Sequence, residues 1–168
     1  LFNKNYLLVG PSYNKKLILK KSKITKNIDL SCVLFETKKL IKFNFYDENF
    51  FFFWTDIDLI KRVNNSNFKM VIAKNSFAKH NMSSSSDTLI NVNYLRDKSF
   101  KYGELIFDYK YNNLRFLKIS RQLFQNLLSV ILNLILFNKK KIIRNIGYTA
   151  GIVNFCFFYF KKKFKVLF

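Results

Sequence analysis

The acidic residues of this chain all lie in its first two thirds. Residues 109–168 contain no Asp or Glu, although they contain twelve Lys and Arg residues, and the whole chain of 168 residues has a formal net charge of +20. Charge of one sign at this density opposes a compact fold unless a polyanion neutralises it, and a nucleic acid does so while releasing its condensed counterions. The sequence therefore predicts an RNA or DNA partner, with an anionic membrane surface as the alternative.

A folded core is nevertheless expected. Hydrophobic residues make up 49% of the chain and aromatic residues 18%, which is too much for a disordered segment. A chain of this length can bury a core without metal or disulfide staples. The 21 Phe and 9 Tyr against 4 Gly and 1 Pro are typical of coding by an AT-rich genome. We therefore expect a protein encoded by a mitochondrial or plastid genome, with the mitochondrial matrix as its expected location, in agreement with a start that shows no cleavable targeting peptide.

The sequence contains few of the groups that catalysis or metal binding requires. Cys32, Cys156 and His80 are too few for a four-ligand zinc site. We interpret Asp56 and Asp58 as a solvent-exposed pair at the end of a strand, and the four glycines do not form a phosphate-binding loop. The expectation is a protein without enzymatic activity or cofactor.

Short runs of apolar and β-branched residues, separated by polar turns, predict strands over much of the chain. The predicted strands are residues 17–19, 28–35, 40–46, 50–54, 68–73, 89–95, 105–109 and 152–160. Residues 1–16 are interpreted as an N-terminal arm.

One helix is predicted, over residues 120–137, with Ser120 as its N-cap. Its polar residues share one face, so we expect that face to be exposed and the apolar remainder to be buried. These polar residues are Gln122, Gln125, Asn126, Ser129 and Asn133. The apolar stretch is shorter than the roughly 20 residues that a membrane span requires. Residues 139–141, all Lys, then follow the helix, where their charge would favour its dipole.

The fold class predicted from these elements is α+β, with small antiparallel sheets packed on a helix. We expect tandem domains in which the second is reduced. The predicted boundaries are an N-terminal arm at 1–16, a first sheet-plus-helix domain at 17–136, and a shortened second domain at 137–168.

The C-terminal third carries a recognisable order of motifs. An Arg-x-Leu-x-x-Asn-apolar-apolar pattern begins at Arg121 and is followed by Phe-x-Lys-Lys at 137–140, two isoleucines, and Asn-Ile-Gly-Tyr-Thr-Ala at 145–150. This order resembles the large-subunit ribosomal protein L-six family, in which a helix closes the first domain and a strand with Gly-Val-Gly-Tyr-(Arg/Lys)-Ala opens the second. Asn145 and Thr149 depart from that pattern, and the family continues for longer than this chain.

The resemblance implies a structural constituent of the mitochondrial large ribosomal subunit that binds large-subunit rRNA near the factor-binding region. The implied partners are this rRNA, neighbouring ribosomal proteins, and a second chain if one completes the shortened domain. The basic clusters themselves give the candidate contacts. The residues predicted to contact RNA are Arg121, Lys139, Lys140, Lys141, Arg144, Tyr148, Lys161, Lys162, Lys163 and Lys165. A small-subunit mitochondrial ribosomal protein and an organelle-encoded subunit of an inner-membrane complex are the alternatives.

Overall fold

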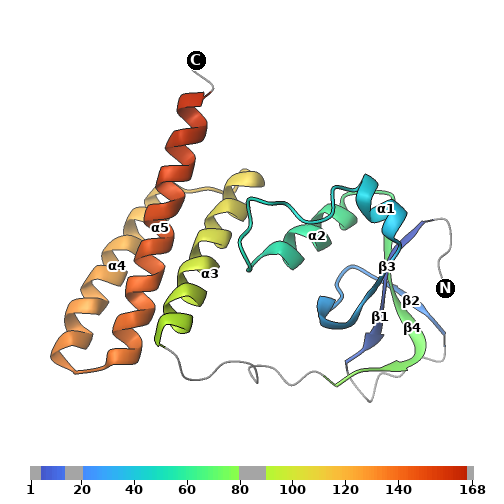
Figure 1. Ribbon diagram of the computed structural model, residues 1–168, viewed down its shortest axis with the longest axis horizontal. Coiled ribbons are helices and arrows are strands. Elements are labelled where there is room, and N and C mark those ends of the chain that lie inside the picture. Colours follow the sequence, from blue (N-terminus) through green and yellow to red (C-terminus); the bar gives the residue numbers. More distant parts are fainter. Residues whose placement is uncertain (1–4, 14–20, 80–89, 166–168) are drawn as a thin grey trace. The chain divides into compact units, whose positions relative to one another are not determined.

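The computed structural model describes residues 5–13, 21–79 and 90–165. The chain forms two compact units, each with its own hydrophobic core (Figure 1). Unit 1 comprises Leu1–Asp47 and Thr55–Ser84, and unit 2 comprises Glu48–Trp54 and Ser85–Phe168. Unit 1 contains a four-stranded sheet and unit 2 contains three long helices. The predicted α+β fold class is confirmed.

The sheet of unit 1 has the strand order β2-β4-β1-β3. Its strands are β1 (Tyr6–Ser12), β2 (Lys23–Thr25), β3 (Leu34–Phe35) and β4 (Lys69–Phe77). β1 runs parallel to β4, whereas the two outer strands pair antiparallel. The sheet is therefore mixed, not antiparallel as predicted, because the chain between β1 and β4 is long enough for a crossover.

The segment predicted as an N-terminal arm contains β1, one of the two inner strands of this sheet. Leu7, Leu8 and Val9 are all buried. Consecutive burial is typical of a strand that is covered on both faces, and it removes the alternation by which strands are usually recognised. The arm interpretation was therefore wrong for the described residues 5–13.

Two helices pack in unit 1, α1 (Thr37–Lys42) and α2 (Thr55–Asn64), with the 3-10 turn η2 (Leu30–Cys32) before β3. Leu40 of α1 and Leu59 and Val63 of α2 join the core beside Met70 of β4. The strand predicted over residues 68–73 is confirmed as part of β4, whereas α1 replaces the start of the strand predicted over 40–46. The strand predicted over 17–19 lies outside the described residues.

An ion pair is buried beside this core. Asp58 of α2 is fully buried and accepts a 2.8 Å hydrogen bond from Nε of Arg62. The Arg62 guanidinium also donates to the backbone carbonyls of Phe43 (2.8 Å) and Phe45. The interpretation of Asp58 as a solvent-exposed strand-end residue was therefore wrong, because an arginine one helical turn away neutralises its buried charge.

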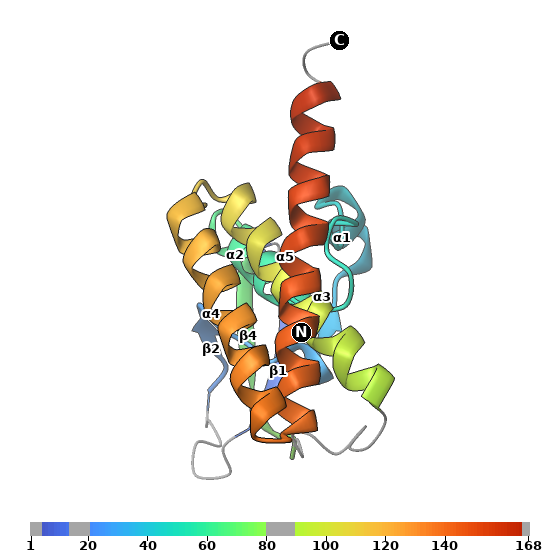
Figure 2. The ribbon, with the colours of Figure 1, turned by 90° about the vertical axis from the view of Figure 1, so that its left-hand side faces the viewer.

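Unit 2 consists of α3 (Ile90–Lys110), α4 (Phe116–Ile135) and α5 (Lys139–Lys165). α5 packs against both α3 and α4 (Figures 1 and 2). The strands predicted over 105–109 and 152–160 are helical, as is the described part, from residue 90, of the strand predicted over 89–95. Residues 139–165 form one helix where a shortened sheet domain was expected. Phe and Tyr have high β propensity, and this composition supplies them in every element, so propensity alone misplaced these segments.

Two glycines allow α5 to approach α3 closely. A Cβ on Gly151 would lie 2.6 Å from the carbonyl oxygen of Lys98, and one on Gly147 would lie 3.0 Å from that of Tyr94. The two glycines are four residues apart and so share one face of the helix. The close backbone approach expected at Gly147 is present, but within a helix and with no positive φ, not at a strand turn.

Replacing Gly151 by Leu is expected to destabilise unit 2 by about 1–3 kcal/mol, because the helices must separate to accommodate the side chain. The fluorescence of Trp54 reports the unfolding of unit 2, because its ring lies against Phe100 and Phe107 of α3. Urea unfolding followed by Trp54 fluorescence measures the loss. Asn154→Leu, at an exposed position of α5, is the control, and equal midpoints for the two variants would contradict the packing role of Gly151.

The faces of α4 are reversed from the prediction. Gln122 accepts a 2.8 Å hydrogen bond from the buried Nζ of Lys101, and Asn133 is buried. The Ser129 hydroxyl accepts hydrogen bonds from the side-chain amides of Asn133 (3.1 Å) and of Asn145 on α5 (2.7 Å). Gln122, Ser129 and Asn133 therefore lie toward α3 and α5, whereas Gln125 is exposed as predicted. Most of the apolar side that was expected in the core is exposed, although Leu123 packs against the core of unit 2.

Candidate nucleic-acid interface

The basic cluster at residues 139–141 begins a helix instead of ending one. The Asn138 side chain caps α5 by accepting a 3.2 Å hydrogen bond from the backbone N–H of Lys141. Three ammonium groups therefore lie at the positive end of the helix dipole, the reverse of the arrangement expected from the sequence. Cations at this end are unfavourable, whereas an anion is attracted by the helix dipole. The start of α5 is thus suited to binding a phosphate.

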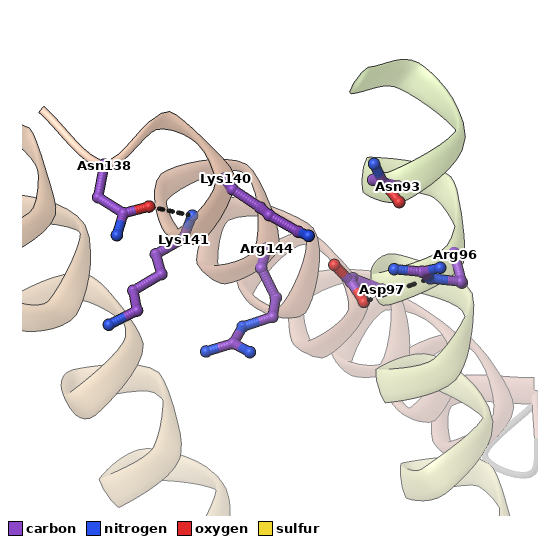
Figure 3. A pocket seen from close by; sticks show the side chains of 7 residues that line it. All are labelled: Asn93, Arg96, Asp97, Asn138, Lys140, Lys141 and Arg144. Carbon is purple, nitrogen blue, oxygen red and sulfur yellow. Dashed lines mark hydrogen bonds and ion pairs between the residues drawn. The ribbon is translucent and has the colours of Figure 1, made fainter. Parts of the chain in front are cut away.

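A cavity of about 290 Å³ opens beside this helix start, between α3 and α5 (Figure 3). Four of its lining residues are cationic and one, Asp97, is acidic. The lining residues are Asn93, Arg96 and Asp97 of α3, then Asn138 directly before α5, and Lys140, Lys141 and Arg144 of α5. The Lys140 side chain extends from α5 toward α3, as Figure 3 shows. We call this site the α5 cavity.

The cations of the α5 cavity are incompletely neutralised. Arg96 Nε lies 4.0 Å from Asp97 Oδ1, a weak ion pair. Among residues 5–13, 21–79 and 90–165, no carboxylate forms a salt bridge with Lys140, Lys141 or Arg144. Burial raises the pKa of the Asp97 carboxyl, against the opposite influence of Arg96 and Arg144. The cavity therefore retains a positive potential that one partly desolvated carboxylate does not cancel.

Replacing Asp97 by Asn should stabilise the protein more as the pH rises. A carboxyl whose pKa is higher in the folded than in the unfolded state is protonated in both states at low pH. As the pH rises above its unfolded pKa it increasingly lowers the free energy of unfolding, until the pH exceeds its folded pKa. The difference in unfolding free energy, Asp97→Asn minus wild type, is expected to increase as the pH rises from below to above the usual pKa of an Asp side chain, about 3.9. Urea unfolding across that range measures it, and a difference that falls with rising pH would contradict the assignment.

The other predicted contacts lie apart from the α5 cavity. Lys161, Lys162 and Lys163 are exposed near the end of α5, about 30 Å from Lys141 at 1.5 Å per residue. Lys162 Nζ lies 5.3 Å from the centroid of the Tyr109 ring. For Lys165, the last residue of α5, only the backbone is described.

Arg121 is exposed on α4, and Tyr148 is half-buried one turn after Arg144. Burial and, next, the charge of Asp97 raise the pKa of the Tyr148 hydroxyl. Sequence reasoning missed Arg96, because residues 89–95 were interpreted as a strand and nothing then placed the following arginine beside α5. If residues 90–110 had been interpreted as a helix, Arg96 would have been a candidate, since it lies next to Asp97 at a polar position.

Comparisons of the chain with protein-family models, with curated proteins and with solved structures gave no match. Within the described part of the chain, no helix has the length and apolar character needed to cross a membrane. Cys32 and Cys156 are free thiols, and His80 lies outside the described residues.

Proposed function

We propose that this protein is a structural RNA-binding component of the large subunit of a mitochondrial ribosome. The observation that carries the proposal is the α5 cavity, which Arg96, Lys140, Lys141 and Arg144 line beside a helix N-terminus. A sugar-phosphate backbone supplies the negative charge that this arrangement lacks. The proposal rests on charge and geometry. The choice of subunit rests only on the order of sequence motifs shared with the L-six family, because residues 145–150, a strand in that family, are helical here.

The mode of binding follows from the groups involved. Lysine and arginine contacts to phosphate fix the position and register of a protein on a nucleic acid but do not read its sequence. Lys140 and Arg144 are one helical turn apart on α5, and Arg96 comes from α3, so a phosphate in the cavity would be held from two helices. Folded rRNA is recognised chiefly through its shape and its backbone.

The exposed lysines at 161–163 offer a second contact along the same helix. A rigid helix holds the two basic groups at a fixed separation of about 30 Å. Two separated phosphate contacts on one rigid element favour a folded RNA, whose backbone positions are fixed, over a flexible strand. Arg121 on α4 supplies a further exposed cation.

The proposal is tested in the organelle by replacing Lys139, Lys140 and Lys141 together by Glu. The tagged variant should leave the large-subunit peak of a sucrose gradient and accumulate in the light fractions. A matched variant, Lys23→Glu with Lys26→Glu and Lys42→Glu, changes three exposed lysines of unit 1 and should remain in the peak. Normal incorporation of the first variant would overturn the proposal, and sedimentation of the wild type with the small subunit would favour the small-subunit alternative.

A further inference from the structure

Helix α4 leaves a broad apolar face uncovered. Eleven large apolar side chains on or directly after this helix are each at least 46% exposed. They are Phe116, Leu117, Phe124, Leu127, Leu128, Ile131, Leu132, Leu134, Ile135, Leu136 and Phe137. We call this surface the α4 face. A contiguous exposed apolar surface on a folded protein marks an interaction site.

The hydrogen bonds and ion pairs of α4 hold this face outward. Lys118 Nζ lies 3.4 Å from Glu104 and 3.5 Å from Asp108 of α3, and Gln122 accepts from Lys101. Farther along, Ser129 is bound by Asn145 of α5. Turning the apolar face inward would break each of these contacts and bury their polar atoms without partners, at about 1–3 kcal/mol each. The exposure of the α4 face is therefore built into unit 2.

The charges around the α4 face lie only at its ends. Residues 122–138 contain no charged residue, whereas Arg115, Lys118 and Arg121 lie at one end and Lys139, Lys140 and Lys141 at the other. A cavity of about 520 Å³ at the first end is lined by Arg115, Phe116, Leu117, Lys118 and Arg121. Within the described segments, no carboxylate forms a salt bridge with Arg115 or Arg121.

We propose that the α4 face binds an amphipathic helix of a different protein, apolar along its centre and acidic at its ends. The 20 residues of α4 present a stripe about 30 Å long, which matches a partner helix of similar length that lays its apolar side on the stripe. A carboxylate at the end of the partner would enter the cavity between Arg115 and Arg121. Complementary charges at the ends would then fix the register of the two helices.

The charge pattern favours this partner helix over two alternatives, a second copy of the chain and an anionic bilayer. A second copy of this chain would place basic ends against basic ends in either helix orientation, and like charges across an interface are costly. A helix lying on an anionic bilayer has Lys and Arg along the length of its polar face. Here the polar face of α4 is neutral from 122 to 138 and is already bound to α3 and α5.

The test uses the full chain and a labelled synthetic peptide of about 20 residues. The peptide has Leu at helical i, i+3, i+4 and i+7 spacing, two Glu residues at each end and Gln elsewhere. A second peptide has Lys in place of each Glu. Fluorescence anisotropy is expected to show binding of the Glu peptide, at least tenfold tighter than the Lys peptide. Replacing Phe124, Ile131 and Ile135 by Gln should weaken binding of the Glu peptide at least tenfold.

A matched variant replaces Val153, Phe157 and Phe160, exposed apolar residues of α5, by Gln and should bind the Glu peptide as the wild type does. Arg115→Gln with Arg121→Gln should reduce the preference for the Glu peptide. Equal binding of both peptides, or no effect of the α4 substitutions, would overturn the proposal. So would dimerisation of the free chain, or its binding to phosphatidylglycerol vesicles, if either is abolished by the α4 substitutions. The variant with Phe124, Ile131 and Ile135 replaced is expected to retain RNA binding, so failure of this proposal is distinguishable from failure of the proposed function.

Discussion

Replacing Lys140 and Arg144 together by Glu is expected to weaken binding of a structured rRNA fragment about 100-fold or more. Both side chains line the α5 cavity and come from successive turns of α5. A hydrogen bond to a charged group contributes about 1.5–3 kcal/mol, so the loss of two amounts to at least about 3 kcal/mol, and each 1.4 kcal/mol is a factor of ten. The introduced carboxylates add repulsion to this loss.

The measurement is fluorescence anisotropy titration with a labelled folded RNA over a range of salt concentrations. For binding to a duplex backbone, the slope of log K against log salt concentration should become less steep by about 0.9 for each phosphate that the variant no longer neutralises. Lys38→Glu with Lys42→Glu is the matched control, because these exposed lysines are also four residues apart on a helix and give the same change in charge. If the control loses as much affinity as the cavity variant, binding depends on net charge alone and the α5 cavity has no special role.

The candidate site could be predicted only in part from the sequence. Lys140, Lys141 and Arg144 were predicted from the absence of acidic neighbours, and the structure brings them into one cavity. Arg96 was missed, because a contact between segments far apart in sequence depends on tertiary packing. The charge of each residue can be read locally, but a cavity lined by cations of two helices requires that α3 and α5 lie side by side, and this depends on the close approach at Gly147 and Gly151.

The apolar face of α4 shows where pattern and burial diverge. Amphipathic periodicity correctly predicted a helix over most of Phe116–Ile135. The assumption that its apolar side faces the core was wrong, because Gln122, Ser129 and Asn133 find hydrogen-bond partners within unit 2. A periodic pattern identifies two faces, but it does not say which partner covers each. Polar residues that find hydrogen-bond partners inside the unit can be buried. The apolar side of the helix is then left exposed to another chain.

Replacing Arg62 by Met is expected to destabilise unit 1 by about 3 kcal/mol or more. The substitution removes the arginine that forms an ion pair with the Asp58 carboxylate, whose side chain has no exposed surface, and removing one member of a buried pair costs about 3–5 kcal/mol. It also removes the donors to the carbonyls of Phe43 and Phe45, which flank the left-handed residue Asn44. Native-state hydrogen exchange should show this as faster opening of β1 and β4.

The increase in exchange of those amides should be at least about 100-fold, since 1.4 kcal/mol corresponds to tenfold. A double variant, Asp58→Leu with Arg62→Met, removes the stranded charge as well as its partner. Apolar replacement of a whole buried pair is often neutral or stabilising, so the double variant should recover a large part of the lost stability. It should not recover all of it, because the carbonyls of Phe43 and Phe45 still lack their donor. An Arg62→Met variant with amides that exchange within fivefold of the wild type would show that Asp58 does not need its arginine, and that another group holds α2 against the sheet.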